Sequence, residues 1–201
     1  MKHFLGGKSE IPNGNVLKRR LQSLAMLDAV LMPDWELRYF SFNSKWAENT
    51  MMASMRDGEG SEFFYLFDPA GACGKIFCPG QSEPDSLLDQ IPKEFGSFLS
   101  KPAFNLQQIT CCMWQRQTEV CWSLIPGQIK QIPLLAFAGD RGDYYRIWAE
   151  QYYERPVSSL GVIAIFNQQP ITAELLLSLN EDLSLEGIVA DADEIGYPVD
   201  Q

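Results

Sequence analysis

The sequence predicts an α+β domain: a mostly antiparallel sheet built from consecutive hairpins, with helices packed on it. Strand-like stretches follow one another between residues 35 and 125, separated by turn signals such as Asp57-Gly58. Residues 16–31 and the last third of the chain instead repeat apolar side chains at helical spacing. Because helices and strands do not alternate regularly, we expect hairpins rather than parallel crossover units.

A helix is predicted first, starting at Val16 with Asn15 as its N-cap and ending before Pro33. Its apolar stripe consists of Leu17, Leu21, Leu24, Leu27 and Leu31. The basic residues 18–20 fall in its first turns, where the helix dipole disfavours positive charge. We therefore expect these three side chains to pair with acidic groups elsewhere in the fold.

The middle of the chain contains the predicted strands. They cover residues 35–42, 50–56, 62–67 and 75–77, followed by a second hairpin of 106–116 and 119–125 and by a buried strand or extended segment at 132–137. Residues 62–67 are apolar on both faces, which is typical of a central strand or of one covered on both sides. A short helix is expected to start at Pro92.

The last third of the chain predicts helices and one ambiguous segment. A helix capped by Asp140 or Asp143 should run to about residue 155. Its inward stripe would consist of Tyr145, Trp148, Ala149 and Tyr152. Residues 161–166 fit either a final strand or a buried helix end, Pro170 should open another helix, and residues 183–201 form an acidic tail.

The composition fits one packed domain, because 46% of the 201 residues are apolar. We expect a flexible N-terminal arm over residues 1–14 and a single globular domain over residues 15–201 with an acidic C-terminal segment. The N-terminus has no apolar signal-peptide core, and no apolar run approaches the ~20 residues that cross a bilayer. The odd count of five cysteines favours reduced thiols and a cytoplasmic location.

The charge balance narrows the classes of partner. A net charge of -10 argues against binding nucleic acid, whose phosphates need Lys and Arg, and against an anionic membrane surface. It would steer a basic protein toward the chain. The alternative is that the acidic charge only keeps the protein in solution.

Histidine is nearly absent, because His3 at the N-terminus is the only one. This argues against Ser-His-Asp and Cys-His nucleophiles and against most zinc sites. Cys111 and Cys112 should point to opposite faces of a strand, and Cys73 and Cys78 alone leave a zinc site short of ligands. We expect no metal and no cofactor, and the residues favour a non-enzyme, although catalysis by carboxylates alone stays open.

Eight residues are candidates for binding a ligand or partner. They are Arg56 and Asp57 in a hairpin turn, Asp140, Arg141 and Asp143 before a helix, and the aromatic residues Trp114, Tyr144 and Tyr153, which are expected to be exposed. The two charged groups also fit purely structural roles, as a tight turn and as a helix N-cap. Most aromatic side chains must belong to the core.

Two features carry a resemblance to a known family. They are the segment Ile91-Pro92-Lys93-Glu94-Phe95 leading to Phe98-Leu99, and the strands around Trp35 and Trp114. In these, and in its acidic, aromatic-rich, single-domain composition, the chain resembles bacterial toxin-immunity proteins of the SUKH superfamily. The resemblance implies stoichiometric binding and inhibition of a partner toxin without catalysis.

Three functional hypotheses follow. The first is a non-catalytic protein-binding domain, an immunity-type inhibitor of a basic partner protein, with an acidic and aromatic patch on one face. The second is a small-molecule-binding enzyme or sensor that uses a carboxylate and arginine loop. The third is a structural subunit of an oligomer, and the sequence leaves the oligomeric state open.

Overall fold

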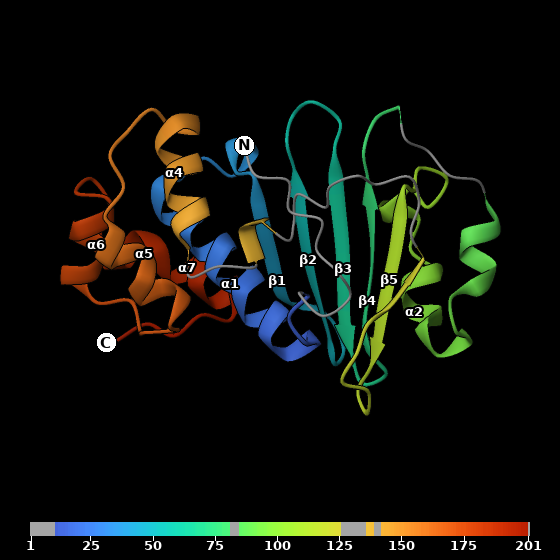
Figure 1. The fold of residues 1–201 in the computed structure, drawn as a ribbon. Coiled ribbons are helices and arrows are strands. Elements are labelled where there is room, and N and C mark those ends of the chain that lie inside the picture. Colours follow the sequence, from blue (N-terminus) through green and yellow to red (C-terminus); the bar gives the residue numbers. More distant parts are fainter. Residues whose placement is uncertain (1–10, 81–84, 126–135, 139–141, 201) are drawn as a thin grey trace.

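The protein is built around one six-stranded antiparallel sheet whose strands lie side by side in chain order (Figure 1). The computed structural model describes residues 11–80, 85–125, 136–138 and 142–200. The strands are β1 (Phe40–Ala47), β2 (Thr50–Arg56), β3 (Glu62–Asp68), β4 (Gly71–Phe77), β5 (Cys111–Arg116) and β6 (Ser123–Ile125). Each strand pairs antiparallel with the next, which confirms the predicted α+β class of consecutive hairpins.

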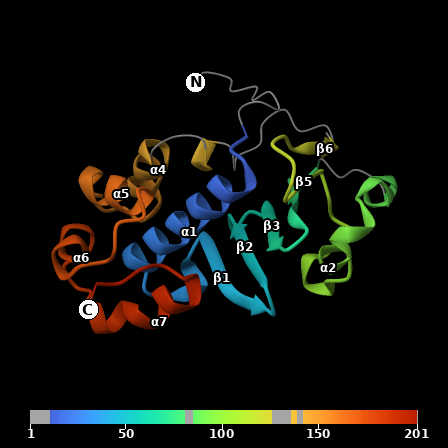
Figure 2. The same ribbon diagram turned by 90° about the horizontal axis from the view of Figure 1, so that it is seen from below.

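Helices cover both faces of this sheet, as Figures 1 and 2 show. The larger layer contains α1 (Gly14–Leu31), α4 (Asp143–Tyr152), α5 (Ser159–Phe166), α6 (Ala173–Leu179) and α7 (Leu185–Ile195). The opposite side carries α2 (Gly96–Leu99) and the 3-10 turns Asp85–Gln90, Lys93–Phe95 and Pro102–Phe104. Of the helices in the described residues, none is long and apolar enough to cross a membrane.

Helix α1 is the central helix of the larger layer. Asn13, not Asn15, is its N-cap, because the Asn13 carboxamide accepts a hydrogen bond from the Val16 N–H at 3.0 Å. The helix ends at Leu31, two residues before Pro33. Of the expected N-terminal arm, residues 1–10 lie outside the described residues, whereas Ile11 is buried in the core.

The two faces of the sheet bury two separate apolar clusters. The face under α1 contains Phe63, Tyr65 and Phe67 of β3, and the opposite face contains Phe64 and Leu66. This confirms that residues 62–67 form a central strand covered on both sides. Cys111 and Cys112 likewise belong to different clusters, as their adjacent positions on a strand predict.

Residues 35–42 do not form one strand, which corrects the prediction from their alternating pattern. Trp35–Leu37 is a 3-10 turn, and the strand begins only at Phe40. The Asp34 carboxylate accepts a hydrogen bond from the Glu36 N–H at 3.2 Å and so caps the turn. Local capping therefore outweighs the alternation of apolar side chains in the first half of this stretch.

In the C-terminal third of the chain, the longer elements that the structure describes are helices. Residues 161–166 lie in α5, which selects the helix over the strand, and Thr172 rather than Pro170 begins α6 as its N-cap. Helix α4 begins at Asp143, with Gly142 as the cap residue at φ 96°, so Asp143 does not cap it. Residues 132–135 lie outside the described residues, and residues 136–138 form a helical turn instead of a strand.

The acidic tail is an ordered part of the fold. Most of it is helix α7, which packs on α1 and β1. Arg38 holds Asp191 through two hydrogen bonds, at 2.5 and 3.0 Å, and Lys45 contacts both carboxylate oxygens of Asp193 at 2.7 Å. Asp191 and Asp193 of the tail therefore form ion pairs that hold α7 against the rest of the fold.

Candidate functional site

The turn that contains Arg56 and Asp57 is built by its own backbone. One Asp57 carboxylate oxygen accepts hydrogen bonds from the Glu59 and Ser61 N–H groups, each at 2.8 Å. The Arg56 guanidinium lies 5.4 Å from the centre of the Phe64 ring, on the sheet face away from α1. Asp57 therefore stabilises the hairpin turn, whereas Arg56 packs on a ring of the sheet, and the two side chains do not converge on one site.

The second charged candidate group is described only in part. Asp140 and Arg141 lie outside the described residues, and Asp143 is exposed in the first turn of α4. Of the carboxylate-and-arginine loop expected from the sequence, only Asp143 therefore lies within the described residues.

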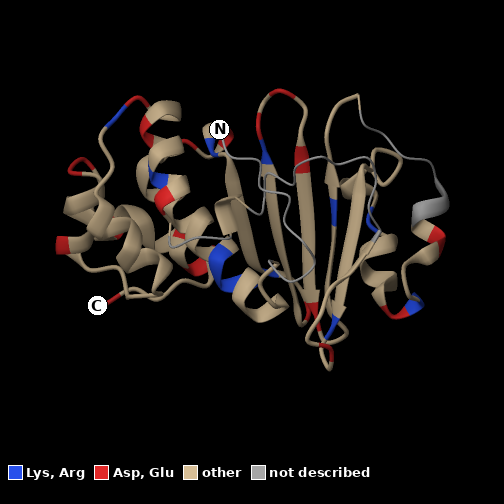
Figure 3. Cartoon of the chain, in the orientation of Figure 1, with Lys and Arg blue, Asp and Glu red and all other residues tan. Residues whose placement is uncertain are grey.

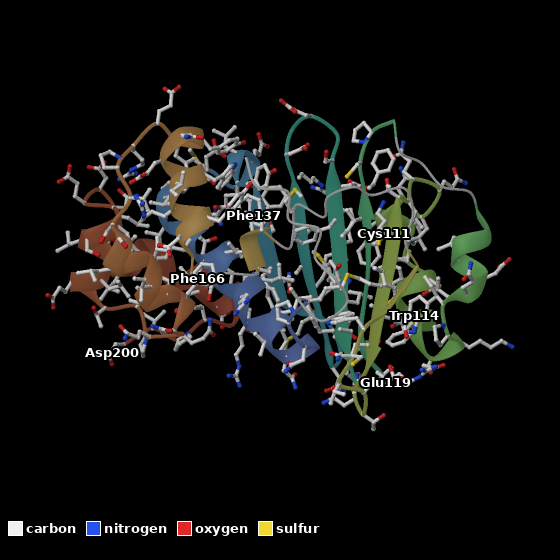
Figure 4. All side chains as sticks on the ribbon, viewed as in Figure 1. Cys111, Trp114, Glu119, Phe137, Phe166 and Asp200 are labelled. Atoms are coloured by element: carbon white, nitrogen blue, oxygen red, sulfur yellow. The ribbon has the colours of Figure 1, made fainter. Side chains whose placement is uncertain are left out.

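The three aromatic candidates differ in exposure. Tyr144 is 47% exposed on α4. Trp114 is 8% exposed, which corrects the expectation of an exposed ring: β5 is an inner strand, and this face is covered by the α2 side of the molecule (Figure 4). Tyr153 is half-buried, because it follows α4 at the point where the chain turns back onto the core and its ring packs beside Trp148.

The clearest surface feature is a continuous set of aromatic rings over α4 and the start of β1. We call it the aromatic face: it consists of the rings of Tyr39, Tyr144, Trp148 and Tyr152, together with the exposed Ile147 on the same helix. Trp148 is central: its ring lies 4.6 Å from that of Tyr39 and 4.8 Å from that of Tyr152. Tyr144 joins the set through the buried Phe137, which it meets edge-on at 4.8 Å.

Exposure of the aromatic face follows from the periodicity of α4. Tyr145 and Ala149 point into the core, which leaves Tyr144, Ile147 and Tyr152 on the outside with 46% to 51% of each side chain exposed. The predicted inward stripe is therefore right for Tyr145 and Ala149 and wrong for Tyr152. Large apolar surface grouped in this way marks binding sites more often than scattered single residues do.

Carboxylates border the aromatic face. Burial raises the pKa of Tyr39, and the negative charges of Asp57 and Glu59 raise it further. The Arg56 N–H donates a hydrogen bond to the Tyr39 carbonyl oxygen at 3.0 Å, so the β2–β3 hairpin lies beside Tyr39. Asp143 adds an exposed carboxylate in the first turn of α4. Figure 3 shows acidic residues at the tip of the β2–β3 hairpin, as well as on other turns and helices.

A buried carboxylate beneath the aromatic face connects the elements that carry it. Asp28 of α1 accepts hydrogen bonds from the Tyr39 and Phe40 N–H groups at 2.9 and 2.6 Å, and from the Tyr145 hydroxyl at 2.6 Å. Complete burial raises its pKa to about 6, against the lowering effect of these hydrogen bonds. One side chain thus joins α1, β1 and α4, the elements that carry or support the exposed rings.

A polar cleft lies at the other end of the sheet, beside the turns that follow β1, β3 and β5. It has a volume of about 810 Å³ and is bordered by the first turn of α1. In Figure 4, Glu119 marks this end of the molecule. Sequence analysis did not find this cleft; of the basic residues 18–20, Lys18 belongs to its lining.

Burial affects three of the five cysteine thiols. Burial raises the pKa of Cys112 to about 12 and raises those of Cys73 and Cys78, so these thiols stay protonated near neutral pH. Cys121 is exposed and lies outside the β5–β6 pairing. Among the described residues there is no group of three or more His, Cys, Asp or Glu side chains arranged to hold a metal ion.

Comparisons of the chain with protein-family models, with curated proteins and with solved structures found no match.

Proposed function

We propose that this chain is a non-catalytic protein-binding domain that engages a basic partner protein through the aromatic face. The observation that supports the proposal is the exposure of Tyr144, Ile147 and Tyr152 around the half-buried Trp148, next to the carboxylates of the hairpin tip. Tyrosine and tryptophan are enriched among the residues that dominate binding energy. The bordering carboxylates select a partner of positive charge.

The two parts of the surface act at different stages of binding. The net charge of -10 and the acidic border increase the rate of encounter with a basic protein. Desolvation of the aromatic rings then slows dissociation. A partner that presents a positively charged active site would be blocked by such a complex, which is how an immunity-type inhibitor acts.

Affinity capture with matched variants tests the proposal. Wild-type protein, Tyr144→Ser/Tyr152→Ser and the control Leu160→Ser are immobilised, since Leu160 is 80% exposed on α5 and outside the aromatic face. We expect a basic protein to be held by wild type and Leu160→Ser and released as salt rises. The double variant should bind the purified partner at least ~10-fold more weakly, as loss of hot-spot rings requires.

Two outcomes would contradict the proposal. One is a retained protein whose affinity is equal for wild type and Tyr144→Ser/Tyr152→Ser, since its contact would then lie elsewhere. The other is concentration-dependent self-association in sedimentation that the double variant abolishes. In that case the aromatic face joins copies of this chain, and the protein is a structural subunit.

A further inference from the structure

Three rings of the aromatic face recur every four residues along α4. Tyr144, Trp148 and Tyr152 therefore follow one another along one flank of this helix. The rings of Trp148 and Tyr152 are stacked, with their centres 4.8 Å apart and their planes inclined by 19°. Tyr152 is 46% exposed and Trp148 is half-buried. The stack therefore presents flat, partly desolvated ring surface to another molecule.

Carboxylates of the hairpin tip lie next to this stack. Tyr39 connects the two parts, because its ring centre is 5.6 Å from that of Tyr152 and its carbonyl oxygen accepts the Arg56 N–H at 3.0 Å. Asp57 and Glu59 follow in the same turn, and their negative charges raise the pKa of Tyr39. Glu59 is exposed and forms no ion pair with any residue that the structure describes. Its carboxylate is therefore available to a cation from outside.

Two arginines that neighbour these rings in the chain point elsewhere. Arg38 is held by an ion pair to α7 at 2.5 Å. Positions two apart in an α-helix point to nearly opposite sides, so Arg146 lies away from Tyr144 and Trp148. It pairs with Glu150, four residues further along the same helix, at 2.8 Å. Neither guanidinium group covers the stacked rings.

Ring surface beside a carboxylate suits a guanidinium better than an ammonium group. The guanidinium of arginine is planar and weakly hydrated, so it lies flat on an aromatic ring while its N–H groups donate to a carboxylate. The ammonium group of lysine is compact and strongly hydrated, and it has no flat surface to place on the ring. The chemistry of the aromatic face therefore distinguishes between the two common cationic side chains of proteins.

We propose that the aromatic face recognises an arginine side chain of the partner protein, which stacks on Tyr152 and Trp148 and forms an ion pair with Glu59. This inference rests on the proposed function and adds to it the chemical identity of the partner's anchoring residue. A basic protein that presents only lysine at its contact surface binds more weakly, although its net charge is the same.

Three capped tripeptides test the inference by ¹H–¹⁵N NMR titration of the whole chain at constant ionic strength. They are Gly-Arg-Gly, Gly-Lys-Gly and Gly-citrulline-Gly, each acetylated at its N-terminus and amidated at its C-terminus. Lysine keeps the charge without the plane, and citrulline keeps the plane without the charge. We expect the arginine peptide to shift the backbone amides of residues 57–59 and 143–153 saturably, and the other two to bind at least ~3-fold more weakly.

Matched variants locate the bound peptide. Tyr152→Leu should weaken binding of the arginine peptide ~3-fold or more, whereas Tyr152→Phe keeps the ring and should leave the affinity unchanged. Glu59→Gln should weaken it ~2-fold. Glu174→Gln makes the same change of charge on α6, which carries no ring of the aromatic face, and should have no effect. Tyr152 and Glu59 are exposed, so these substitutions leave the core intact.

The inference is overturned if the arginine peptide produces no saturable shifts up to 50 mM, or if the lysine peptide binds as tightly. Neither result contradicts the proposed function, because exposed rings and negative charge still attract a basic protein. A captured partner whose affinity is the same for wild type and Tyr144→Ser/Tyr152→Ser contradicts the proposed function instead, whatever the peptides show. The two failures are therefore distinguishable.

Discussion

At the scale of single residues, the least expected feature is the buried Asp28. A carboxylate with no exposed surface ordinarily destabilises a fold, yet this one accepts hydrogen bonds from two backbone N–H groups and a tyrosine hydroxyl. Its carboxylate oxygens accept these hydrogen bonds at the place where α1, β1 and α4 meet. The residue therefore contributes to the shape of the aromatic face, although it is not part of that surface.

Asp28 makes stability depend on pH in a predictable direction. The folded-state pKa of about 6 exceeds the unfolded value of 3.8, so the native state holds this proton more tightly. Below pH 4 both states are protonated; as pH rises from 4 to 6 only the unfolded state ionises, and stability falls by roughly 3 kcal/mol. Denaturation of wild type and Asp28→Asn between pH 4 and 7 measures this, and parallel pH profiles would refute it.

Lys75 is the second buried charge, on the opposite face of the sheet. Its ammonium contacts the Glu62 carboxylate at 2.8 Å and the carbonyl oxygens of Gln108 and Asn105 at 3.0 and 3.1 Å. Lys75→Met should lower the free energy of unfolding by ~3–5 kcal/mol, because it leaves these acceptors without a donor. Lys45→Met, which removes an exposed ion pair with Asp193, should cost less than ~1 kcal/mol in the same urea titration. Equal losses would show that burial of Lys75 is unimportant.

At the scale of elements, β4 passes unusually close to the ring of Tyr65. A Cβ atom at Gly74 would lie 2.3 Å from that ring, closer than atoms can approach. Gly74→Ala should therefore destabilise the protein by ~1–3 kcal/mol. Gly96→Ala is the control, since Gly96 is helical and has nothing within 4 Å of the added atom. The thermal midpoints of the two variants measure this difference. The prediction is wrong if Gly74→Ala is as stable as Gly96→Ala.

The elements also show where sequence patterns were sufficient. Asp57-Gly58 predicted a hairpin correctly because a positive φ, here 73° at Gly58, is a local requirement. The position of Trp114 could not be predicted, because its burial depends on the distant residues 91–109 that cover β5. The hydrogen bond from the Gly14 N–H to Gln115 Oε1 could not be predicted for the same reason, since the two residues are 101 positions apart in the chain.

At the scale of the whole molecule, the aromatic face and the polar cleft lie at opposite ends of the sheet. The hairpin tip with Asp57 and Glu59 lies near the aromatic face, and the cleft lies at the turns that follow β1, β3 and β5. The field of the whole chain, whose net charge is -10, attracts a cationic partner over long distances.

Steering by this field gives a kinetic prediction for the partner complex. Glu59→Gln removes an exposed carboxylate beside the aromatic face and should lower the association rate constant ~2-fold at low salt, with little change in dissociation. The difference should vanish above ~0.5 M salt, where charges are screened within a few ångströms. Stopped-flow or surface-plasmon kinetics decide this, and a change confined to the dissociation rate would argue against steering.

The strand order has a consequence for how the chain is made. Because every strand pairs with its neighbour in sequence, the whole sheet can assemble progressively as the nascent polypeptide leaves the ribosome. Helix α1 is synthesised before the sheet, yet it packs against α5, α6 and α7 as well as β1 and β2, so one side of it stays uncovered until α7 has emerged. An element that is made before the strands is thus enclosed only after all of them, and in the meantime it offers an apolar surface to chaperones.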